Sequence, residues 1–343
     1  MPKNRYCVAG VLAAAMFFMN SDKAGLSVNA AVVKNAALDS DEASEEKNTK
    51  TTRITLDYDQ VFIEGSGASY DEESRISLTA GGTYIISGQS ESIYFYIDCN
   101  DAETVSMVFD NAEIISPSTS VIFCEKAENL ILETAPHSSN YVSDIGGRSG
   151  TAEILNPADA LIYSKSDLTL KGNGSIEIFA SYHEGICTEG DFSVESGSIN
   201  LSSNNNGISV QGEICIEDGS LFVSSQRNGL NAQSEEKNVY ILGGTIDIFS
   251  LGDGIRTESD MYISGGSLSV VAGNGSESEE DILFGDSHKG IFIGSDLYIL
   301  NGTVHVDSFD YSLYIEDNMK FTGGYLNLQA GTAEKVFTDS LKI

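Results

Sequence analysis

Residues 185–206 read GICTEGDFSVESGSINLSSNNN, and residues 207–228 repeat the same plan as GISVQGEICIEDGSLFVSSQRN. Each copy has 22 residues and opens with Gly and Ile. This start recurs, with Leu for Ile or Ser for Gly in places, at spacings of 22, 22, 25, 36 and 22 residues. Its positions are Gly185, Gly207, Gly229, Gly254, Gly290 and Ser312. A fixed repeat of this length is typical of solenoids.

Apolar and polar residues alternate within each repeat, and a period of two indicates strands. Three such stretches, for example 192–194 and 199–201, fit in one repeat. Three strands per coil of about 22 residues are typical of a β-helix, whose stacked coils form three parallel sheets around an apolar interior. The sequence therefore predicts an all-β, right-handed parallel β-helix. A β-sandwich is the alternative, but it would not explain the fixed register.

The chain divides into three predicted segments. Residues 1–30 are typical of a signal peptide, because Lys3 and Arg5 precede an apolar run, Val8–Met19, that is too short to span a bilayer. A retained anchor is the alternative. Residues 31–50 are polar and predict a disordered linker, and residues 51–343 form the β-helix domain. Two loops are expected to leave the helix, at about 135–157 and 274–287.

The charge balance excludes some partners. The net charge is -32, from 51 acidic and 19 basic residues. Nucleic acids and anionic membranes require clustered Lys and Arg, so neither is expected as a partner. A strongly acidic surface suits solubility or multivalent cations with oxygen ligands. The sequence leaves the oligomeric state open, and also the thiol or disulfide state of Cys99, Cys124, Cys187 and Cys215.

Three segments carry a family resemblance: residues 160–174 (ALIYSKSDLTLKGNG), 80–88 (AGGTYIISG) and 287–291 (SHKGI). They resemble a clostridial family of secreted carbohydrate-binding β-helix proteins, over roughly residues 54–330. The resemblance implies a polysaccharide-lyase-like β-helix that holds calcium and binds cellulose and pectic acid. This chain departs from the family at its corners, where the family often has Asp-Gly-Ile. Here only Asp253-Gly254-Ile255 keeps that motif.

The residues before the corner glycines form a row with oxygen-bearing side chains. Coils stack about 4.8 Å apart, and Ca²⁺–O distances are about 2.4 Å, so one ion can sit between two neighbouring coils. The expected calcium ligands are Glu184 with Asn206 and Asn228 with Asp253, completed by Glu189 and Glu258. The alternative is a structural row, in which Asn and Asp suit the turns and bond one another along the stack.

A second row lies at the outward position of the second strand in each coil. Tyr240, Tyr262 and Tyr298 occupy it in three consecutive coils. Tyrosine rings can stack on sugar faces and offer a hydroxyl to sugar edges, so these residues are the predicted carbohydrate-binding site. A cross-strand aromatic ladder that only stabilises the sheet is the alternative.

These patterns favour a secreted or cell-surface protein that binds a plant cell-wall type polysaccharide, stabilised by calcium. Catalysis is less favoured, because an eliminase needs a Lys or Arg base beside its substrate. The middle outward positions of the third strands, from Glu177 to Asn327, include neither residue. A polysaccharide lyase acting on uronates and a structural or adhesive protein with a protein partner are the alternatives.

Overall fold

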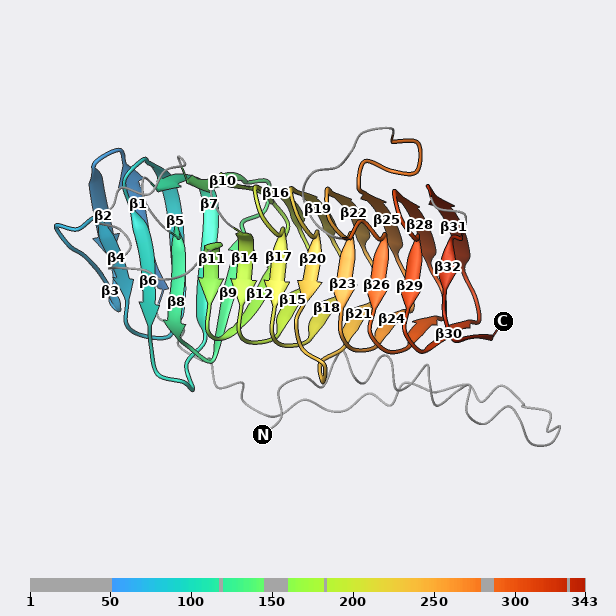
Figure 1. Cartoon of the computed structure of the whole chain (residues 1–343). Helices are drawn as coiled ribbons and strands as arrows, with labels where there is room; N and C mark the ends of the chain where they lie inside the picture. The colour runs from blue at the N-terminus through green and yellow to red at the C-terminus, as the bar shows by residue number, and fades with distance from the viewer. Residues whose placement is uncertain are drawn as a thin grey trace. The chain divides into compact units, whose positions relative to one another are not determined.

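The computed structural model describes residues 51–116, 120–144, 160–181, 184–278, 287–331 and 334–342. Lys50–Ile343 form one compact unit, and every regular element among the described residues is a β-strand (Figure 1). The predicted signal peptide and linker lie outside these residues. So do residues 145–157 of the first predicted loop and residues 279–286 of the second. The first loop was predicted to begin too early, because Ser139–Asp144 form a strand, β10.

The first strands of successive coils pair into a twelve-stranded sheet, parallel except where β3 meets β4. Figure 1 shows this sheet facing the viewer. Its members are β3 (Ala68–Tyr70), β4 (Arg75–Leu78), β6 (Tyr94–Asp98), β8 (Ile122–Lys126), β11 (Ala160–Ser164), β14 (Glu184–Thr188), β17 (Ile208–Val210), β20 (Leu230–Ala232), β23 (Ile255–Thr257), β26 (Ile291–Ile293), β29 (Leu313–Ile315) and β32 (Val336–Phe337).

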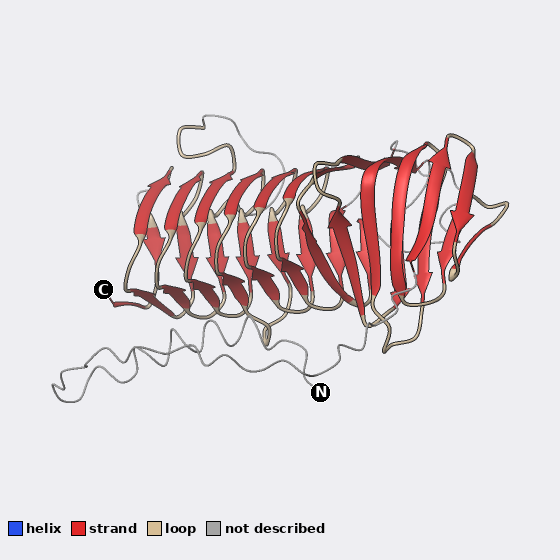
Figure 2. Cartoon of the chain, turned by 180° about the vertical axis from the view of Figure 1, so that it is seen from behind, coloured by secondary structure: helices blue, strands red, loops and turns tan. Residues whose placement is uncertain are grey.

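The second and third strands follow in each coil. The second strands are β9 (Asn129–Thr134), β12 (Asp167–Gly172), β15 (Phe192–Val194), β18 (Ile214–Ile216), β21 (Val239–Ile241), β24 (Met261–Ile263), β27 (Leu297–Ile299), β30 (Asn318–Phe321) and β33 (Ser340–Lys342). The third strands are β10 (Ser139–Asp144), β13 (Ser175–Ala180), β16 (Ser198–Ser203), β19 (Ser220–Ser225), β22 (Thr245–Ser250), β25 (Ser267–Ala272), β28 (Thr303–Ser308) and β31 (Tyr325–Ala330). Figure 2 shows the chain from behind.

The N-terminal coils are built differently from the repeats. β1 (Thr51–Asp57) pairs in parallel with β5 (Gly82–Ser90) and antiparallel with β2 (Gln60–Glu64), which covers the first coil. β7 (Val105–Ser116) is long enough to pair with β9 along its first half and with β10 along its second half. It therefore joins the second and third strands into one hydrogen-bonded sheet, and the described strands form two sheets instead of the predicted three.

The register between first strands confirms the predicted β-helix. Ile186 pairs with Ile208, Ile208 with Leu230, and Ile291 with Leu313, each 22 residues apart. The longer repeats keep the same register, because Leu230 pairs with Ile255 and Ile255 with Ile291. The additional residues lie between strands, after β20 and after β25.

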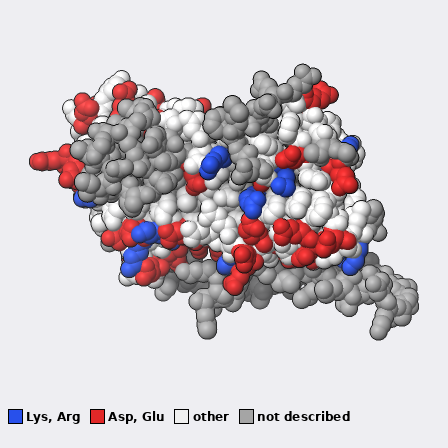
Figure 3. All heavy atoms as spheres, viewed as in Figure 1, with Lys and Arg blue, Asp and Glu red and all other residues white. Residues whose placement is uncertain are grey.

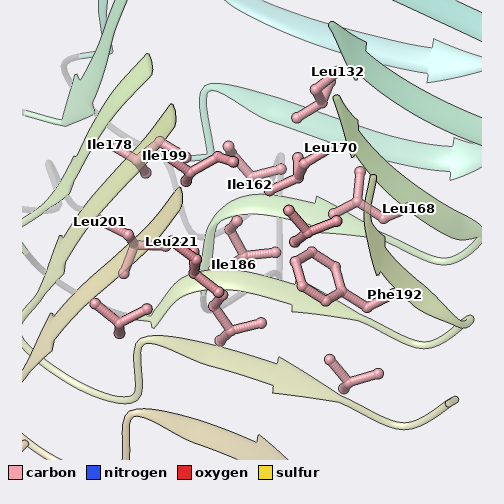
Figure 4. Close-up of a cluster of buried hydrophobic side chains, with 14 of the residues drawn as sticks. Leu132, Ile162, Leu168, Leu170, Ile178, Ile186, Phe192, Ile199, Leu201 and Leu221 are labelled. Atoms are coloured by element: carbon pink, nitrogen blue, oxygen red, sulfur yellow. The ribbon is translucent and has the colours of Figure 1, made fainter. Parts of the chain in front are cut away.

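Inward side chains fill the coil interior with stacked aliphatic groups. In the first strands the stack runs through Ile186, Ile208, Leu230, Ile255 and Ile291, all fully buried. Figure 4 shows Ile162 and Ile186 of this stack facing Leu168, Leu170 and Phe192 from the second strands, and Ile199 and Leu201 from a third strand. Because each inward residue repeats in the next coil, the core continues along the helix and holds the outer faces at fixed spacing.

Candidate functional site

Three outer faces carry the outward side chains of the first, second and third strands, and we call them the first-strand, second-strand and third-strand faces. Each is rigidly supported by the buried stack behind it. The predicted calcium ligands lie at the two ends of the first strands. The predicted tyrosine site lies on the second-strand face.

The predicted calcium row before the corner glycines is a chain of hydrogen bonds. The Asn206 side-chain amide donates to Glu184 Oε1 (2.8 Å), and the Asn228 backbone N–H donates to Asn206 Oδ1 (3.1 Å). The Asp253 backbone N–H donates in turn to Asn228 Oδ1 (3.0 Å). Each asparagine oxygen therefore accepts from the next coil, and the NH₂ group of Asn206, not its oxygen, faces Glu184.

Asp253 is the most enclosed member of the row, with 1% of its surface exposed. Its Oδ1 accepts hydrogen bonds from the Ser287 hydroxyl (2.6 Å) and the Lys289 backbone N–H (2.8 Å). The Arg256 guanidinium lies 3.5 Å from Oδ2. The Lys289 ammonium donates to Ser287 Oγ (2.7 Å) and so reaches Asp253 through one hydroxyl. Protein cations and donors already surround this carboxylate.

Glu189 and Glu258 lie at the other end of the first strands. Glu184 begins β14 and Glu189 follows its end, and five residues of extended chain span about 16 Å. Glu189 accepts from the Tyr163 hydroxyl, and Glu258 pairs with Arg256 at 2.6 Å. The six predicted ligands are thus not brought together. The described residues contain no group of three His, Cys, Asp or Glu that could hold a metal ion, and calcium binding by these six residues stays a prediction.

The three predicted tyrosines form one continuous stack on the second-strand face. The ring centroids of Tyr240 and Tyr262 are 5.2 Å apart, and those of Tyr262 and Tyr298 are 4.7 Å apart, with interplanar angles of 16° and 3°. Tyr240 is only 6% exposed. The rings therefore cover one another's faces, and the face of Tyr262 is closed to a sugar ring on both sides.

The tyrosine hydroxyls also have partners within the same face. Tyr262 donates to Asp260 Oδ2 (3.0 Å), Tyr298 donates to Asp296 Oδ2 (2.8 Å), and Tyr240 accepts from the Asn238 amide (3.0 Å). Burial and the neighbouring carboxylates raise the pKa values of Tyr262 and Tyr298, so both hydroxyls stay protonated. The geometry is that of a cross-strand ladder, in which a glycan could reach only the edge of the Tyr262 ring. Sugar binding by these three residues stays a prediction.

Carboxylates gather where the first strands turn into the second strands, along the lower border of the view in Figure 3. Here too a carboxylate accepts from the next coil: Asp191 from the Glu213 backbone N–H (2.7 Å), and Asp296 from that of Asn318 (2.9 Å). Burial, and then the charge of Asp191, raise the pKa of Glu213 to about 7, and Lys237 opposes the shift. These acids shape a strongly negative border.

The third-strand face is broad and weakly charged. Each third strand from β13 to β31 has six residues and presents three of them outward. All residues of the first outward row carry a hydroxyl: Ser175, Ser198, Ser220, Thr245, Ser267, Thr303 and Tyr325. None of the outward positions of these described strands holds Lys or Arg.

Phenylalanines interrupt this polar face at two places. Phe179 on β13 and Phe249 on β22 are 43% and 44% exposed, and Phe222 on β19 lies against Phe249 with ring centroids 5.6 Å apart. A carboxylate stands two residues before each exposed ring, Glu177 before Phe179 and Asp247 before Phe249. Neither carboxylate bonds to any residue that the structure describes. Exposed rings on the same face as carboxylates without a described partner are an arrangement that the tyrosine ladder lacks.

Glu177, Phe222 and Asp247 occupy the middle outward position of the third strands, which could be predicted from the sequence. Phe179 and Phe249 were not predicted, because the third outward position exists only if the strand has six residues, and alternation of polar and apolar residues does not define where a strand ends. A detectable pattern was present, since Glu177-Ile178-Phe179 and Asp247-Ile248-Phe249 repeat the same acid-Ile-Phe order.

A family model described as "Carbohydrate-binding domain-containing protein" matches residues 72–334. A curated relative with the same description, from Acetivibrio thermocellus, is 26% identical over 151 residues, which are 44% of this chain and 53% of the relative. The match thus spans about half the length of that relative.

Among solved structures, the polysaccharide lyase-like protein from C. thermocellum, as a gadolinium derivative, is similar with a TM-score of 0.51 and 20% identity. The alignment covers 85% of this chain and 96% of that one, and it shows a common fold. Among the residues that the structure describes, no helix has the length and apolarity to cross a membrane.

Proposed function

The chain belongs to the family of carbohydrate-binding domain-containing proteins, and we propose that it binds an extended polysaccharide along its third-strand face. The proposed ligands are plant cell-wall polymers of the cellulose or pectic acid type, and the proposed activity is binding without cleavage. The observation that carries this proposal is the pair of exposed rings, Phe179 and Phe249, on a rigid face lined with hydroxyls.

The physical support comes from how sugars are recognised. Aromatic rings with an open face pack against the apolar face of a sugar ring, and hydroxyl, amide and carboxylate side chains hydrogen bond to sugar hydroxyls. The third-strand face supplies both, whereas the rings on the second-strand face cover one another. A rigid face also binds without the entropic cost of ordering a loop.

Lyase activity is the competing function. It requires a Lys or Arg base beside the bound uronate, and the described third-strand face offers neither residue. A glycan array with and without calcium, run beside an absorbance assay for unsaturated uronates, tests both functions. We expect binding to glucan oligosaccharides or polysaccharides on the array and no increase in absorbance. Product accumulating in proportion to protein would contradict the proposal.

An extracellular location belongs to the same proposal. Its support is the basic start with Lys3 and Arg5 and the apolar run Val8–Met19, which are typical of export. Expression in a bacterial host with a Sec pathway tests it. We expect the full chain to be found outside the cytoplasm, shortened by about the first 30 residues if cleaved. Full-length chain retained in the cytoplasm would contradict it.

Calcium stabilisation is a separate proposal. It is supported by the net charge of -32 and the many carboxylates, because hard oxygen ligands suit Ca²⁺. The row from Glu184 to Asp253 does not require an ion, since its oxygens already accept hydrogen bonds. The Asp253 variants described in the Discussion separate an ion at this row from hydrogen bonding alone.

A further inference from the structure

From the third-strand face we infer that the ligand is one uncharged polysaccharide chain, held along the solenoid axis by two equivalent sites, Glu177/Phe179 and Asp247/Phe249. The inference rests on the proposed function and specifies its ligand class. It assigns stacking to the two phenylalanines, and both hydrogen bonding and the rejection of uronates to the two carboxylates.

The register places the two sites in line along the axis. Glu177 on β13 pairs with Asn200, then Phe222, then Asp247 in successive coils. Phe179 leads in the same way through Ser202 and Ser224 to Phe249. Three coil steps of about 4.8 Å separate the sites by about 14 Å. A disaccharide is too short to reach both, so only a longer chain engages the two sites together.

Each site has the same two parts. Phe179 and Phe249 are both exposed, and the Phe222 ring lies beside Phe249 with an interplanar angle of 37°. The carboxylate of each site stands beside the exposed ring and has no partner among the described residues, although Asp247 is half-buried. A free carboxylate is an acceptor with two oxygens, and its hydrogen bonds to neutral donors are stronger than those of uncharged acceptors. Sugar hydroxyls are such donors.

The stretch between the sites suits a neutral chain as well. It presents Asn200, Ser202 and Ser224, flanked by the hydroxyl row with Ser198 and Ser220. These groups donate and accept without charge. Binding to two linked sites raises affinity by making the second contact intramolecular, so affinity should rise steeply once the oligosaccharide spans both phenylalanines.

The same carboxylates disfavour a polyuronate. A uronate laid on either ring would bring a second negative charge close to Glu177 or Asp247, and the face has no Lys or Arg to offset it. Two like charges about 4 Å apart in water repel each other, and this repulsion weakens binding roughly fivefold for each such contact. The net charge of -32 acts in the same direction at low salt.

The test compares two soluble polymers with one backbone, hydroxyethylcellulose and carboxymethylcellulose, by affinity gel electrophoresis of the full chain in EDTA. We expect hydroxyethylcellulose to retard the protein and carboxymethylcellulose to retard it at least about fivefold less. Raising the salt toward 1 M, where the Debye length is about 3 Å, should narrow the difference.

The charge-removal variant Glu177→Gln/Asp247→Asn assigns the effect to these residues. Carboxymethylcellulose should retard this variant more strongly than the parent, and hydroxyethylcellulose should retard it somewhat less. The matched control is Glu316→Gln/Asp317→Asn, which removes the same two charges from an exposed turn after β29. It should behave like the parent. Circular dichroism checks that all variants are folded.

The outcomes separate the two claims. If the parent binds carboxymethylcellulose in EDTA as tightly as hydroxyethylcellulose, the neutral-chain inference is wrong and the proposed function stands. If the control gains as much as the site variant, the assignment to Glu177 and Asp247 is wrong. If the parent binds neither polymer nor insoluble cellulose, the proposed function itself fails.

Discussion

Asp253 illustrates at the scale of one residue how a corner carboxylate is used in this fold. It is buried, and it accepts from the Lys289 backbone N–H and the Ser287 hydroxyl while Arg256 lies beside it. These donors and the Arg256 charge offset the cost of burying the carboxylate, which would be high without them. The other acids and amides of the row repeat the arrangement more loosely.

Replacing Asp253 tests whether hydrogen bonds or an ion hold this corner. Asp253→Ala leaves the Lys289 N–H without its acceptor, and an unsatisfied buried donor costs about 1–3 kcal/mol. We expect Asp253→Ala to lower the free energy of unfolding by about 2 kcal/mol in EDTA, and Asp253→Asn, which keeps Oδ1, to lose less. Denaturant melts in EDTA and in calcium measure this. Destabilisation seen only in calcium would place an ion here instead.

At the scale of strands and turns, close backbone approach decides which residues the corners accept. Gly254 has no room for a side chain, because a Cβ would lie 2.1 Å from Val270 Cγ1 and 2.5 Å from the Gly290 carbonyl oxygen. Ser312, at the equivalent corner two coils later, is a serine that is fully buried and donates to the Gln329 carbonyl (2.7 Å). The glycines are thus required by packing between coils.

Gly254→Ala adds only one carbon atom, but it should clearly lower the free energy of unfolding. Overpacking of this kind typically lowers the free energy of unfolding by about 1–3 kcal/mol. We expect a decrease in that range, measured by thermal or denaturant melts. The matched variant Ser312→Ala changes the equivalent position and removes one hydrogen bond, with an expected loss of about 1 kcal/mol. Equal stability of Gly254→Ala and the parent would mean that the coils separate easily at this corner.

The acidic turns after the first strands predict a pH effect. Burial and Asp191 raise the pKa of Glu213 to about 7 from its usual 4.5. Between these two values the folded state holds a proton that the unfolded chain has released, so the contribution of Glu213 to stability falls as pH rises through this window. Glu213→Gln should gain stability over the parent as pH increases from about 4.5 to 7, and keep that advantage above 7. Melting temperatures from pH 4 to 8 measure the difference. A constant difference across the range would show that the pKa of Glu213 is not raised.

The strand register could be read from the sequence because the inward residues repeat with the coil. Ile186, Ile208 and Leu230 mark it, and the 25- and 36-residue repeats only lengthen turns. The merging of two faces into one sheet could not be predicted, since it depends on the length of β7. The tyrosine row was predicted in register, but its ring orientation depends on side-chain torsions that the pattern does not specify.

At the scale of the whole molecule, the second-strand and third-strand faces of the β-helix carry different side chains. Acidic turns border the second-strand face, whose tyrosines contact one another. The third-strand face has rows of hydroxyls, two exposed phenylalanines and no Lys or Arg among its described outward residues. Because the core fixes the spacing of the outward side chains along the helix, a flexible loop is not needed to form a long binding surface. Such a surface matches a polymer better than a small sugar.

Binding isotherms on insoluble cellulose, with the full chain, test the central claim most directly. The variants are Phe179→Ala, Phe249→Ala and their combination, with Phe62→Ala, a 52% exposed phenylalanine on β2, as the control. Each ring contributes about 1 kcal/mol by analogy with aromatic pairs, so each single variant should bind about fivefold more weakly. The double variant should lose the product of the two effects because the sites are far apart, and Phe62→Ala should bind like the parent. If the folded double variant binds as tightly as the parent, the third-strand face does not bind the polysaccharide, and the account of this protein's function is contradicted.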